Sequence, residues 1–309
     1  MKAQKQFRHQ RRVLDGVLLL DKPSGITSNA ALQTARRLLN AAKAGHTGTL
    51  DPMATGLLPL TFGEATKFSQ MLLDADKEYE ATVRLGIETD TGDAEGRPIG
   101  EAPVSVSEDD IRAALMRFAG EIEQIPPMYS ALKRDGKPLY EYARAGIEIE
   151  LTPRRVTIHA LELLEFGRES FRIRVACSKG TYIRTLAIDL GRALGCGAHL
   201  SALRRTRIGP FAAGDGTVTL GELEAAPADE RERLLAPADA LVSHLPAVAL
   251  SAEQAAGLLQ GRAVACDGNE RGLVRVYGDG RFLGLGELGD DCRLLPKRLV
   301  ATGTTARQS

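Results

Sequence analysis

The segment KEYEATVRLG, residues 77–86, decides the fold class. Over residues 79–85 its side chains alternate between apolar and polar, which indicates a strand that buries one face. The segment FRIRVAC, residues 171–177, repeats this alternation and places Arg172 and Arg174 on the polar face. Two half-buried strands of this kind predict a sheet that is covered on one side.

The sequence also predicts a further strand and several helices around these two strands. GVLLL, residues 16–20, reads as a buried strand that ends at the turn DKPSG. Predicted helices start after a cap at Thr27 or Ser28, run over 64–73, extend from a capping box at Ser107 to Phe118, and follow SKGTYIR as far as Gly195. Strands that alternate with helices predict a mixed α/β domain.

The last quarter of the chain has a different character. Residues 225–245 are rich in Ala, Pro and charged side chains, which predicts a helical connector. Beyond Pro246 the pattern predicts one helix and then short strands separated by the turns GDG and GELGDD. A small β-rich module is therefore expected at the C-terminus.

Composition excludes some classes of protein. The 309 residues carry 40 basic and 40 acidic side chains, so the net charge is zero and only the distribution of charge could reveal a nucleic-acid partner. Residues 168–211 contain nine basic side chains against two acidic ones. Residues 1–12 contain basic side chains and no acidic one, so this segment is either a solvated arm or a nucleic-acid contact. Apolar runs are too short to span a membrane, which predicts a cytosolic protein.

The segment GHTGTLDPMATGLLP, residues 45–59, places Asp51 before a proline and between glycines. Such neighbours fix the backbone, so Asp51 is either a turn-forming carboxylate or a rigidly positioned functional acid. The acidic segment ETDTGDAEG, residues 88–96, lacks the ligand spacing of a calcium loop and is expected to be a solvated turn. Phosphate-binding glycine loops and nucleophilic serine motifs are missing, and no metal site is predicted.

Five segments, in this order along the chain, resemble the TruB-type tRNA pseudouridine synthases. They are GVLLLDKPSGITSN (16–29), GHTGTLDPMATGLLP (45–59), KEYEATVRLG (77–86), IPPMYSALKRDGKPLYEYAR (125–144) and CSKGTYIRTLAIDLG (177–191). The resemblance covers about residues 15–211 and continues more weakly to the C-terminus.

This resemblance implies a mixed α/β fold with a largely antiparallel sheet, followed by a small PUA-like RNA-binding domain. The implied domains are residues 1–245, with a thumb-like RNA-clamping insertion at about 125–152, and residues 246–309. The implied reaction converts uridine 55 of the tRNA T-loop into pseudouridine, without a metal or another cofactor. The resemblance also implies a cytoplasmic monomer that binds the T-arm of tRNA, uses base flipping and needs no protein partner.

The resemblance also implies the roles of individual residues. The carboxylate of Asp51 would attack the sugar C1′ or remove a sugar proton, Tyr79 would stack on the base, and Arg184 would pair with Asp51. His46 would insert where the flipped nucleotide had been, and Lys22, Tyr182 and Leu203 would complete the substrate site. Contacts to the RNA backbone are expected from Lys133, Arg134, Lys137, Arg172, Arg174, Arg204, Arg205 and Arg207.

Two alternatives remain at the level of sequence. A catalytically silent RNA-binding protein could keep the same cleft, although the intact set of Asp51, Tyr79 and Arg184 argues against it. A guide-RNA-dependent synthase of the same superfamily is disfavoured, because the segment IPPMYSALK is similar to that of stand-alone bacterial enzymes.

Overall fold

The computed structural model describes residues 11–130, 132–147, 149–214, 216–266 and 270–301. The basic segment 1–12 lies outside the described residues except for Arg11 and Arg12. Within the described part, no helix is both long enough and apolar enough to cross a lipid bilayer.

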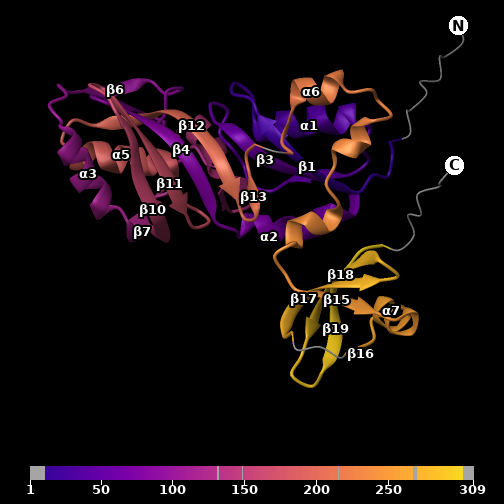
Figure 1. The fold of residues 1–309 in the computed structure, drawn as a ribbon. Coiled ribbons are helices and arrows are strands. Elements are labelled where there is room, and N and C mark those ends of the chain that lie inside the picture. Colours follow the sequence, from indigo (N-terminus) through magenta and orange to yellow (C-terminus); the bar gives the residue numbers. More distant parts are fainter. Residues whose placement is uncertain (1–10, 131, 148, 215, 267–269, 302–309) are drawn as a thin grey trace, which may run out of the picture.

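A large sheet forms the body of the molecule (Figure 1). Its strands are β1 (Gly16–Lys22), β2 (Ala44–His46), β3 (Thr55–Phe62), β4 (Lys77–Leu85), β7 (Gly120–Gln124), β10 (Arg154–Phe166), β11 (Ser170–Cys177), β12 (Ala198–Ile208), β13 (Phe211–Ala212) and β14 (Val218–Thr219). The order is β14-β1-β3-β12-β4-β11-β10-β7, with β2 beside β3 and β13 beside β12. Among the described residues of this sheet, only the β1–β14 and β3–β12 strand pairs are parallel, so the predicted mixed fold with a largely antiparallel sheet is confirmed.

The two halves of this sheet meet where β12 contacts β3. The contact is short and pairs Arg204 with Thr55 and Arg205 with Gly56. Gly56 has a φ of +97°, and a Cβ at this position would lie 2.3 Å from the Arg205 carbonyl oxygen. Glycine is therefore required for the two halves to approach each other.

Helices lie against the sheet and between its strands. They are α1 (Ser28–Leu38), the 3-10 helix η1 (Gly63–Phe68), α2 (Ser69–Leu73), α3 (Glu108–Arg117), α4 (Leu139–Arg144), α5 (Ile183–Ala193), α6 (Leu220–Ala225), the 3-10 helices η2 (Arg231–Leu234) and η3 (Ala238–Val242), and α7 (Ala252–Leu259). Two predicted caps are confirmed: Thr27 accepts from the Ala30 amide, and Ser107 forms a capping box with Asp110.

Two helix predictions are wrong in detail. Residues 64–73 begin as the 3-10 helix η1, because the Thr66 hydroxyl donates to the Gly63 carbonyl and competes with α-helical bonding. Residues 225–245 hold only the end of α6 and two short 3-10 helices, since Pro227 and Pro237 lack the amide hydrogen that a continuous helix needs.

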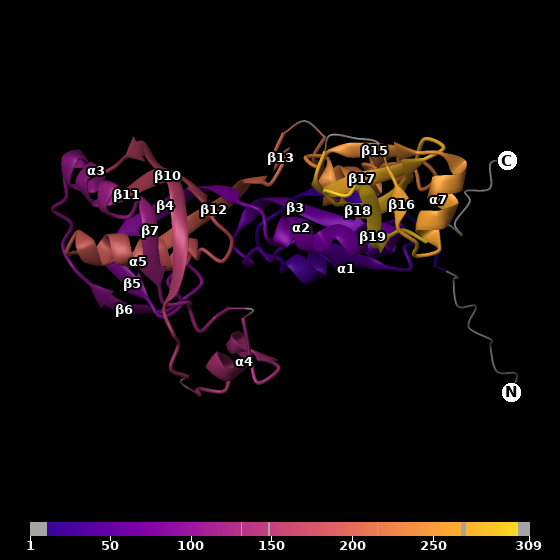
Figure 2. The same ribbon diagram turned by 90° about the horizontal axis from the view of Figure 1, so that it is seen from below.

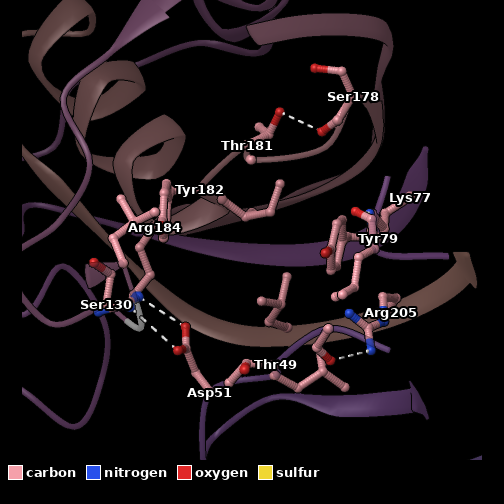
Figure 3. A pocket seen from close by; sticks show the side chains of 17 residues that line it. Thr49, Asp51, Lys77, Tyr79, Ser130, Ser178, Thr181, Tyr182, Arg184 and Arg205 are labelled. Atoms are coloured by element: carbon pink, nitrogen blue, oxygen red, sulfur yellow. Dashed lines mark hydrogen bonds and ion pairs between the residues drawn. The ribbon is translucent and has the colours of Figure 1, made fainter. Parts of the chain in front are cut away.

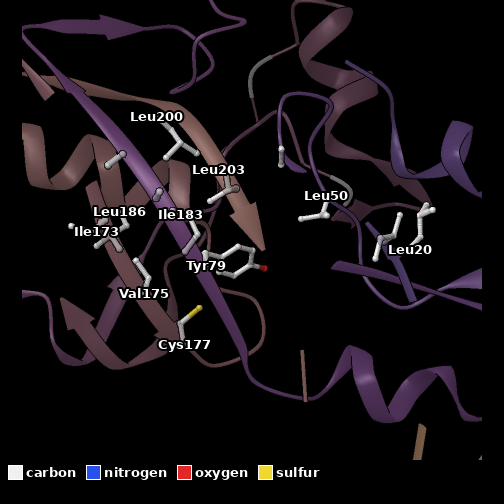
Figure 4. Close-up of a cluster of buried hydrophobic side chains, with 14 of the residues drawn as sticks. Leu20, Leu50, Tyr79, Ile173, Val175, Cys177, Ile183, Leu186, Leu200 and Leu203 are labelled. Atoms are coloured by element: carbon white, nitrogen blue, oxygen red, sulfur yellow. The ribbon is translucent and has the colours of Figure 1, made fainter. Parts of the chain in front are cut away.

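The main core lies between the sheet and the helices α1, α3 and α5. In β4 the residues Ala81, Val83 and Leu85 are buried while their neighbours face outward, as the alternation predicts. Figure 4 shows that this core extends from Leu186 on α5 to Leu20 on β1, with the Tyr79 ring between the two groups of side chains. The same apolar side chains thus support the sheet and one wall of the site described below.

Two smaller units project from the sheet. Between β7 and β10 the chain leaves the body and forms β8 (Lys133–Arg134), β9 (Lys137–Pro138) and α4, which stand apart in Figure 2. We call residues 125–153 the insertion. The hairpin of β5 (Ile87–Thr89) and β6 (Pro98–Glu101) carries a loop that folds back onto β12, where the Leu200 amide donates to the Gly92 carbonyl.

The C-terminal module contains its own sheet. Its strands are β15 (Ala247–Leu250), β16 (Val264–Ala265), β17 (Gly272–Gly278), β18 (Arg281–Leu288) and β19 (Arg293–Leu299), in the order β15-β17-β18-β19-β16. The expected β-rich module is confirmed, although it opens with β15 and not with the helix α7. Phe282 packs on Phe68, with ring centres 5.3 Å apart, so the module is attached through apolar contacts to η1.

Candidate active site

Asp51 lies in the loop between β2 and β3, and backbone contacts fix that loop. The Ser28 hydroxyl at the start of α1 donates to the Leu50 carbonyl (2.9 Å) and accepts from the Leu50 amide (2.8 Å). The Ala54 amide donates to the Asp51 carbonyl (3.1 Å), and Gly48 has a φ of +112°. Asp51 is therefore positioned by its backbone, as its sequence neighbours predict.

Lys22 is fully buried beneath the surface and binds the Asp51 loop through the Pro52 carbonyl. Its ammonium group donates to the carbonyls of Pro23 (2.8 Å), Ile26 (2.8 Å) and Pro52 (3.2 Å). Burial lowers the pKa of Lys22 to about 8, and the nearby Asp51 carboxylate acts against this shift. The expectation that Lys22 contacts substrate is wrong, because its three donors are already used to join the DKPSG turn to the Asp51 loop.

Arg184, in the first turn of α5, forms a two-point ion pair with Asp51. Its Nε lies 2.9 Å from Asp51 Oδ2, and its Nη2 donates to Asp51 Oδ1 at 3.3 Å. The Arg184 side chain is 5% exposed, whereas 32% of the Asp51 side chain remains open to the cavity. Burial raises the pKa of the Asp51 carboxyl, and the guanidinium opposes this effect. The predicted pairing is therefore present.

A second carboxylate shares the same guanidinium, and the sequence did not single it out. Asp93 lies 3.5 Å from Arg184 Nη1 and accepts a hydrogen bond from the Thr91 hydroxyl (2.6 Å). Its side chain is buried, so the expectation that residues 88–96 form a solvated turn is wrong at this position. No local signal separates Asp93 from Asp90 and Glu95, because its burial arises only when the loop folds onto β12.

A cavity of about 360 Å³ opens between Asp51, the start of α5 and the strands β4 and β12 (Figure 3). Tyr79 from β4, Leu203 from β12 and Tyr182 from the residue before α5 form its walls. Burial raises the pKa of both tyrosine hydroxyls, so the rings are neutral. The cavity is in the size range of small-ligand sites. It brings together five of the seven residues expected in the catalytic and substrate site, namely Asp51, Tyr79, Tyr182, Arg184 and Leu203, and Arg205 lines it as well.

His46 lies on the other side of the Asp51 loop. It lines a hollow of about 680 Å³ that also contains Asp51, Tyr129 and Tyr140. Among the residues that the structure describes, the buried His46 Nδ1 atom has no hydrogen-bond partner. Burial and the positive charge of Arg205 lower the pKa of His46, so the ring is neutral and keeps a free polar atom beside the site.

Three family models together match most of the chain. Residues 36–183 match the family model described as TruB family pseudouridylate synthase (N terminal domain). Residues 184–243 match the tRNA pseudouridylate synthase B C-terminal domain, and residues 246–300 match Pseudouridine synthase II TruB, C-terminal. A tRNA pseudouridine synthase B of Aromatoleum aromaticum is 74% identical over 309 residues, which is 100% of both chains.

The chain belongs to the TruB family. It is therefore an enzyme that isomerises uridine in tRNA to pseudouridine. Solved structures of related proteins share its fold. A chain from a Cbf5-Nop10-Gar1 complex has a TM-score of 0.68 and 34% identity, and the match covers 89% of this chain and 78% of that one. A chain from an H/ACA RNP bound to a substrate RNA containing 2'-deoxyuridine has a TM-score of 0.68, 29% identity and coverages of 93% and 85%.

Most basic residues that the sequence suggested for RNA contacts lie on the surface of this TruB-family chain. Lys133, Arg134 and Lys137 are exposed on the hairpin of the insertion, and Arg207 is exposed near the end of β12. Others have carboxylate partners: Arg172 pairs with Glu165, Arg174 with Glu162 and Glu80, and Arg204 with both oxygens of Asp21. Within the described part of the chain, Lys133, Arg134 and Lys137 form no ion pair, although acidic side chains lie in the same segment.

Arg205 is the exception, and the expectation that it contacts RNA phosphates is wrong. Its residue surface is 1% exposed. The Nε atom donates to the Leu57 carbonyl (2.7 Å), and Nη2 donates to the Gly48 carbonyl (3.2 Å). Side chains alternate along β12, so Arg205 faces the cavity with Leu203, while Arg204 points to the opposite side.

Proposed function

We propose that this TruB-family enzyme modifies uridine 55 in the T-loop of tRNA, with the Asp51 carboxylate acting on the sugar. The observation that carries the proposal is the Asp51–Arg184 ion pair in the wall of a cavity closed by Tyr79 and Leu203. A carboxylate oxygen open to the cavity can reach a sugar, and a guanidinium behind it keeps the carboxylate ionised and oriented.

The arrangement fits the steps of the isomerisation. The carboxylate either attacks C1′ or removes a sugar proton, and the C1′–N1 bond breaks with its electron pair leaving on the uracil. The ring turns while it stays against Tyr79, and C5 bonds to C1′ as the carboxylate leaves C1′ or the sugar proton is returned. The C5 proton then departs and N1 takes up a proton. Water at C1′ would convert this isomerisation into hydrolysis, so apolar walls such as Leu203 protect the reaction.

A nucleotide can reach this cavity only after it leaves its stack in the folded RNA. Tyr79 is buried at the end of the cavity, so a base that stacks on it must be turned out of the T-loop. The hollow that is lined by His46, with its unpaired Nδ1 atom, adjoins the Asp51 loop. It can accommodate the part of the T-loop that stays stacked after the target nucleotide has flipped out. We assign His46 to this contact.

The remaining units would hold the RNA. The insertion, with Lys133, Arg134 and Lys137, would clamp the T-arm as a thumb over residues 125–152, and residues 246–309 would add a PUA-like surface to the catalytic residues 1–245. In this scheme the enzyme acts in the cytoplasm as a monomer, without a protein partner or a cofactor.

The test is incubation of the enzyme with an unmodified tRNA transcript, followed by chemical mapping of pseudouridine at single-nucleotide resolution. Pseudouridine should form at position 55, and Asp51→Asn should abolish it while tRNA binding persists, because an amide is neither a nucleophile nor a base. Asp109→Asn, on the exposed side of α3, is the matched control and should remain active. Modification at another position, or an active Asp51→Asn variant, would contradict the proposal.

A further inference from the structure

The two ends of the cavity differ in charge. One end holds the Asp51–Arg184 ion pair, and the other end holds Arg205 and Lys77 on either side of Tyr79 (Figure 3). No carboxylate oxygen in the described ranges lies within 4.0 Å of the Arg205 guanidinium, which is bound by backbone carbonyls. A buried cation without a counter-ion is unfavourable, so its retention calls for an explanation.

Lys77 adds a second positive charge at this end. Its ammonium group donates to the Leu73 carbonyl (2.8 Å) and also to that of Ala75. Burial, assisted by the charge of Arg205, lowers the pKa of Lys77 to about 8, so it still carries a proton at neutral pH. Arginine keeps its charge in any protein environment. The end of the cavity beyond Tyr79 is therefore cationic.

The register of the strands fixes where this charge acts. Arg205 on β12 lies opposite Tyr79 on β4, and Leu203 lies two residues earlier on the same face of β12. A nucleotide whose sugar meets Asp51 extends its base toward Tyr79 and Leu203. The base then lies between the catalytic carboxylate and the two cations.

We propose that Arg205, with the support of Lys77, stabilises the negative charge that develops on uracil when the C1′–N1 bond breaks. The inference rests on the proposed function, in which Asp51 acts at the sugar. The electron pair of the broken bond moves to N1 and spreads to O2 and O4, so departure of the ring needs no proton donor. The same pair, delocalised to C5, then forms the new bond to C1′ as Asp51 leaves the sugar or returns its proton. The C5 proton is released and N1 takes up a proton.

A purely structural role is the competing explanation, because Arg205 also holds the carbonyls of Gly48 and Leu57. The two roles differ in their response to the leaving group. Fluorine at C5 withdraws electrons and stabilises the uracil anion without help from the protein. A residue that stabilises this anion matters less for 5-fluorouridine, whereas a residue that only shapes the cavity matters equally for both substrates.

The experiment measures single-turnover consumption of the target nucleoside in tRNA transcripts that contain uridine or 5-fluorouridine. Nuclease digests are separated by liquid chromatography before mass spectrometry, because the isomerised nucleoside has the same mass as its substrate. Arg205→Met should slow the uridine reaction by about 10²–10³-fold, as expected for loss of one group that stabilises developing negative charge. With 5-fluorouridine the loss should be at least about tenfold smaller. Equal losses with the two substrates would overturn the inference.

Three further variants complete the experiment. Arg205→Lys keeps the charge and should lose less activity than Arg205→Met. Arg231→Met removes an arginine that donates to the backbone carbonyls of Ala226, Leu38 and Glu224 but lies away from the cavity, so both substrates should react at the wild-type rate. If Arg205→Met does not fold, Lys77→Met is used instead, and its loss of rate with uridine is compared with its loss with 5-fluorouridine. Equal losses with the two substrates would count against the inference.

Failure of the inference is distinguishable from failure of the proposed function. A wild-type enzyme that does not modify position 55, or an active Asp51→Asn variant, would remove the proposed function. An active wild-type enzyme, an inactive Asp51→Asn variant and equal losses in Arg205→Met would remove only the role of Arg205.

Discussion

Replacement of Arg184 by lysine is the sharpest test of the ion-pair network. The guanidinium contacts both carboxylate oxygens of Asp51 and one of Asp93, and it donates to the carbonyls of Thr91 (3.1 Å) and Tyr129 (2.7 Å). Lysine retains the positive charge but carries a single nitrogen. It can stay near Asp51 only by giving up contacts that are spread over the planar guanidinium.

The size of the effect follows from the lost contacts. The two carbonyl hydrogen bonds orient the guanidinium, and each bond to a charged group contributes about 1.5–3 kcal/mol, or about 3–6 kcal/mol together. At about 1.4 kcal/mol for a tenfold change in rate, kcat should fall by about 10²–10⁴-fold. The tRNA affinity should change by less than about threefold, because Arg184 is buried rather than on the surface where phosphates bind.

The assay is tritium release from tRNA labelled at C5 of uridine, under single-turnover conditions with saturating enzyme, together with filter binding for Kd. Arg112→Lys on α3 is the control, since this exposed arginine pairs with Glu108 at the surface and should retain full activity. Equal losses in rate and affinity for Arg184→Lys, or a rate close to that of the wild-type enzyme, would refute the reasoning.

The remaining predictions concern pH and salt. Because burial raises the pKa of Asp51 and the charge of Asp93 raises it further, a reaction that needs ionised Asp51 should gain rate as pH rises through this elevated pKa. Asp93→Asn should shift this acidic limb to lower pH and reduce the plateau rate by about 10–100-fold, and an unchanged limb in the pH–rate profile would argue against electrostatic coupling. Lys137→Gln should lower the salt dependence of tRNA binding by about one phosphate contact, whereas Arg205→Met should leave the slope unchanged. A slope that falls for Arg205→Met and not for Lys137→Gln would assign the phosphate contact to Arg205.

Local patterns predicted much of the fold because their causes are local. The alternation in β4 and β11 places apolar side chains on one face whatever the rest of the chain does, and Thr27 and Ser107 cap helices through atoms three residues away. The connector over 225–245 was mispredicted since composition favoured a helix while the spacing of its prolines allowed only short 3-10 turns. The order of strands in the sheet could come only from the family resemblance.

The errors at the site have a common origin in tertiary contacts. Asp93 is indistinguishable from other acids until its loop packs on β12, and Lys22 becomes buried only when two loops meet over it. Arg205 could have been placed correctly: if Leu203 lines the cavity, alternation along the strand puts the side chain two residues later on the same face. The basic composition of LRRTR, residues 203–207, concealed this simple consequence of strand geometry.

The hydrogen bond from Arg184 to the Tyr129 carbonyl joins the insertion to Asp51, the proposed catalytic acid, through one side chain. Any exchange of residues 125–153 that aims to direct the enzyme to other RNAs must therefore preserve this hydrogen bond. A grafted segment of any length must place a backbone carbonyl oxygen where that of Tyr129 now accepts from Arg184. Without this oxygen, Arg184 would no longer hold Asp51 in position. Designs that keep residues 125–130 and vary only the tip of the hairpin satisfy this condition from the outset.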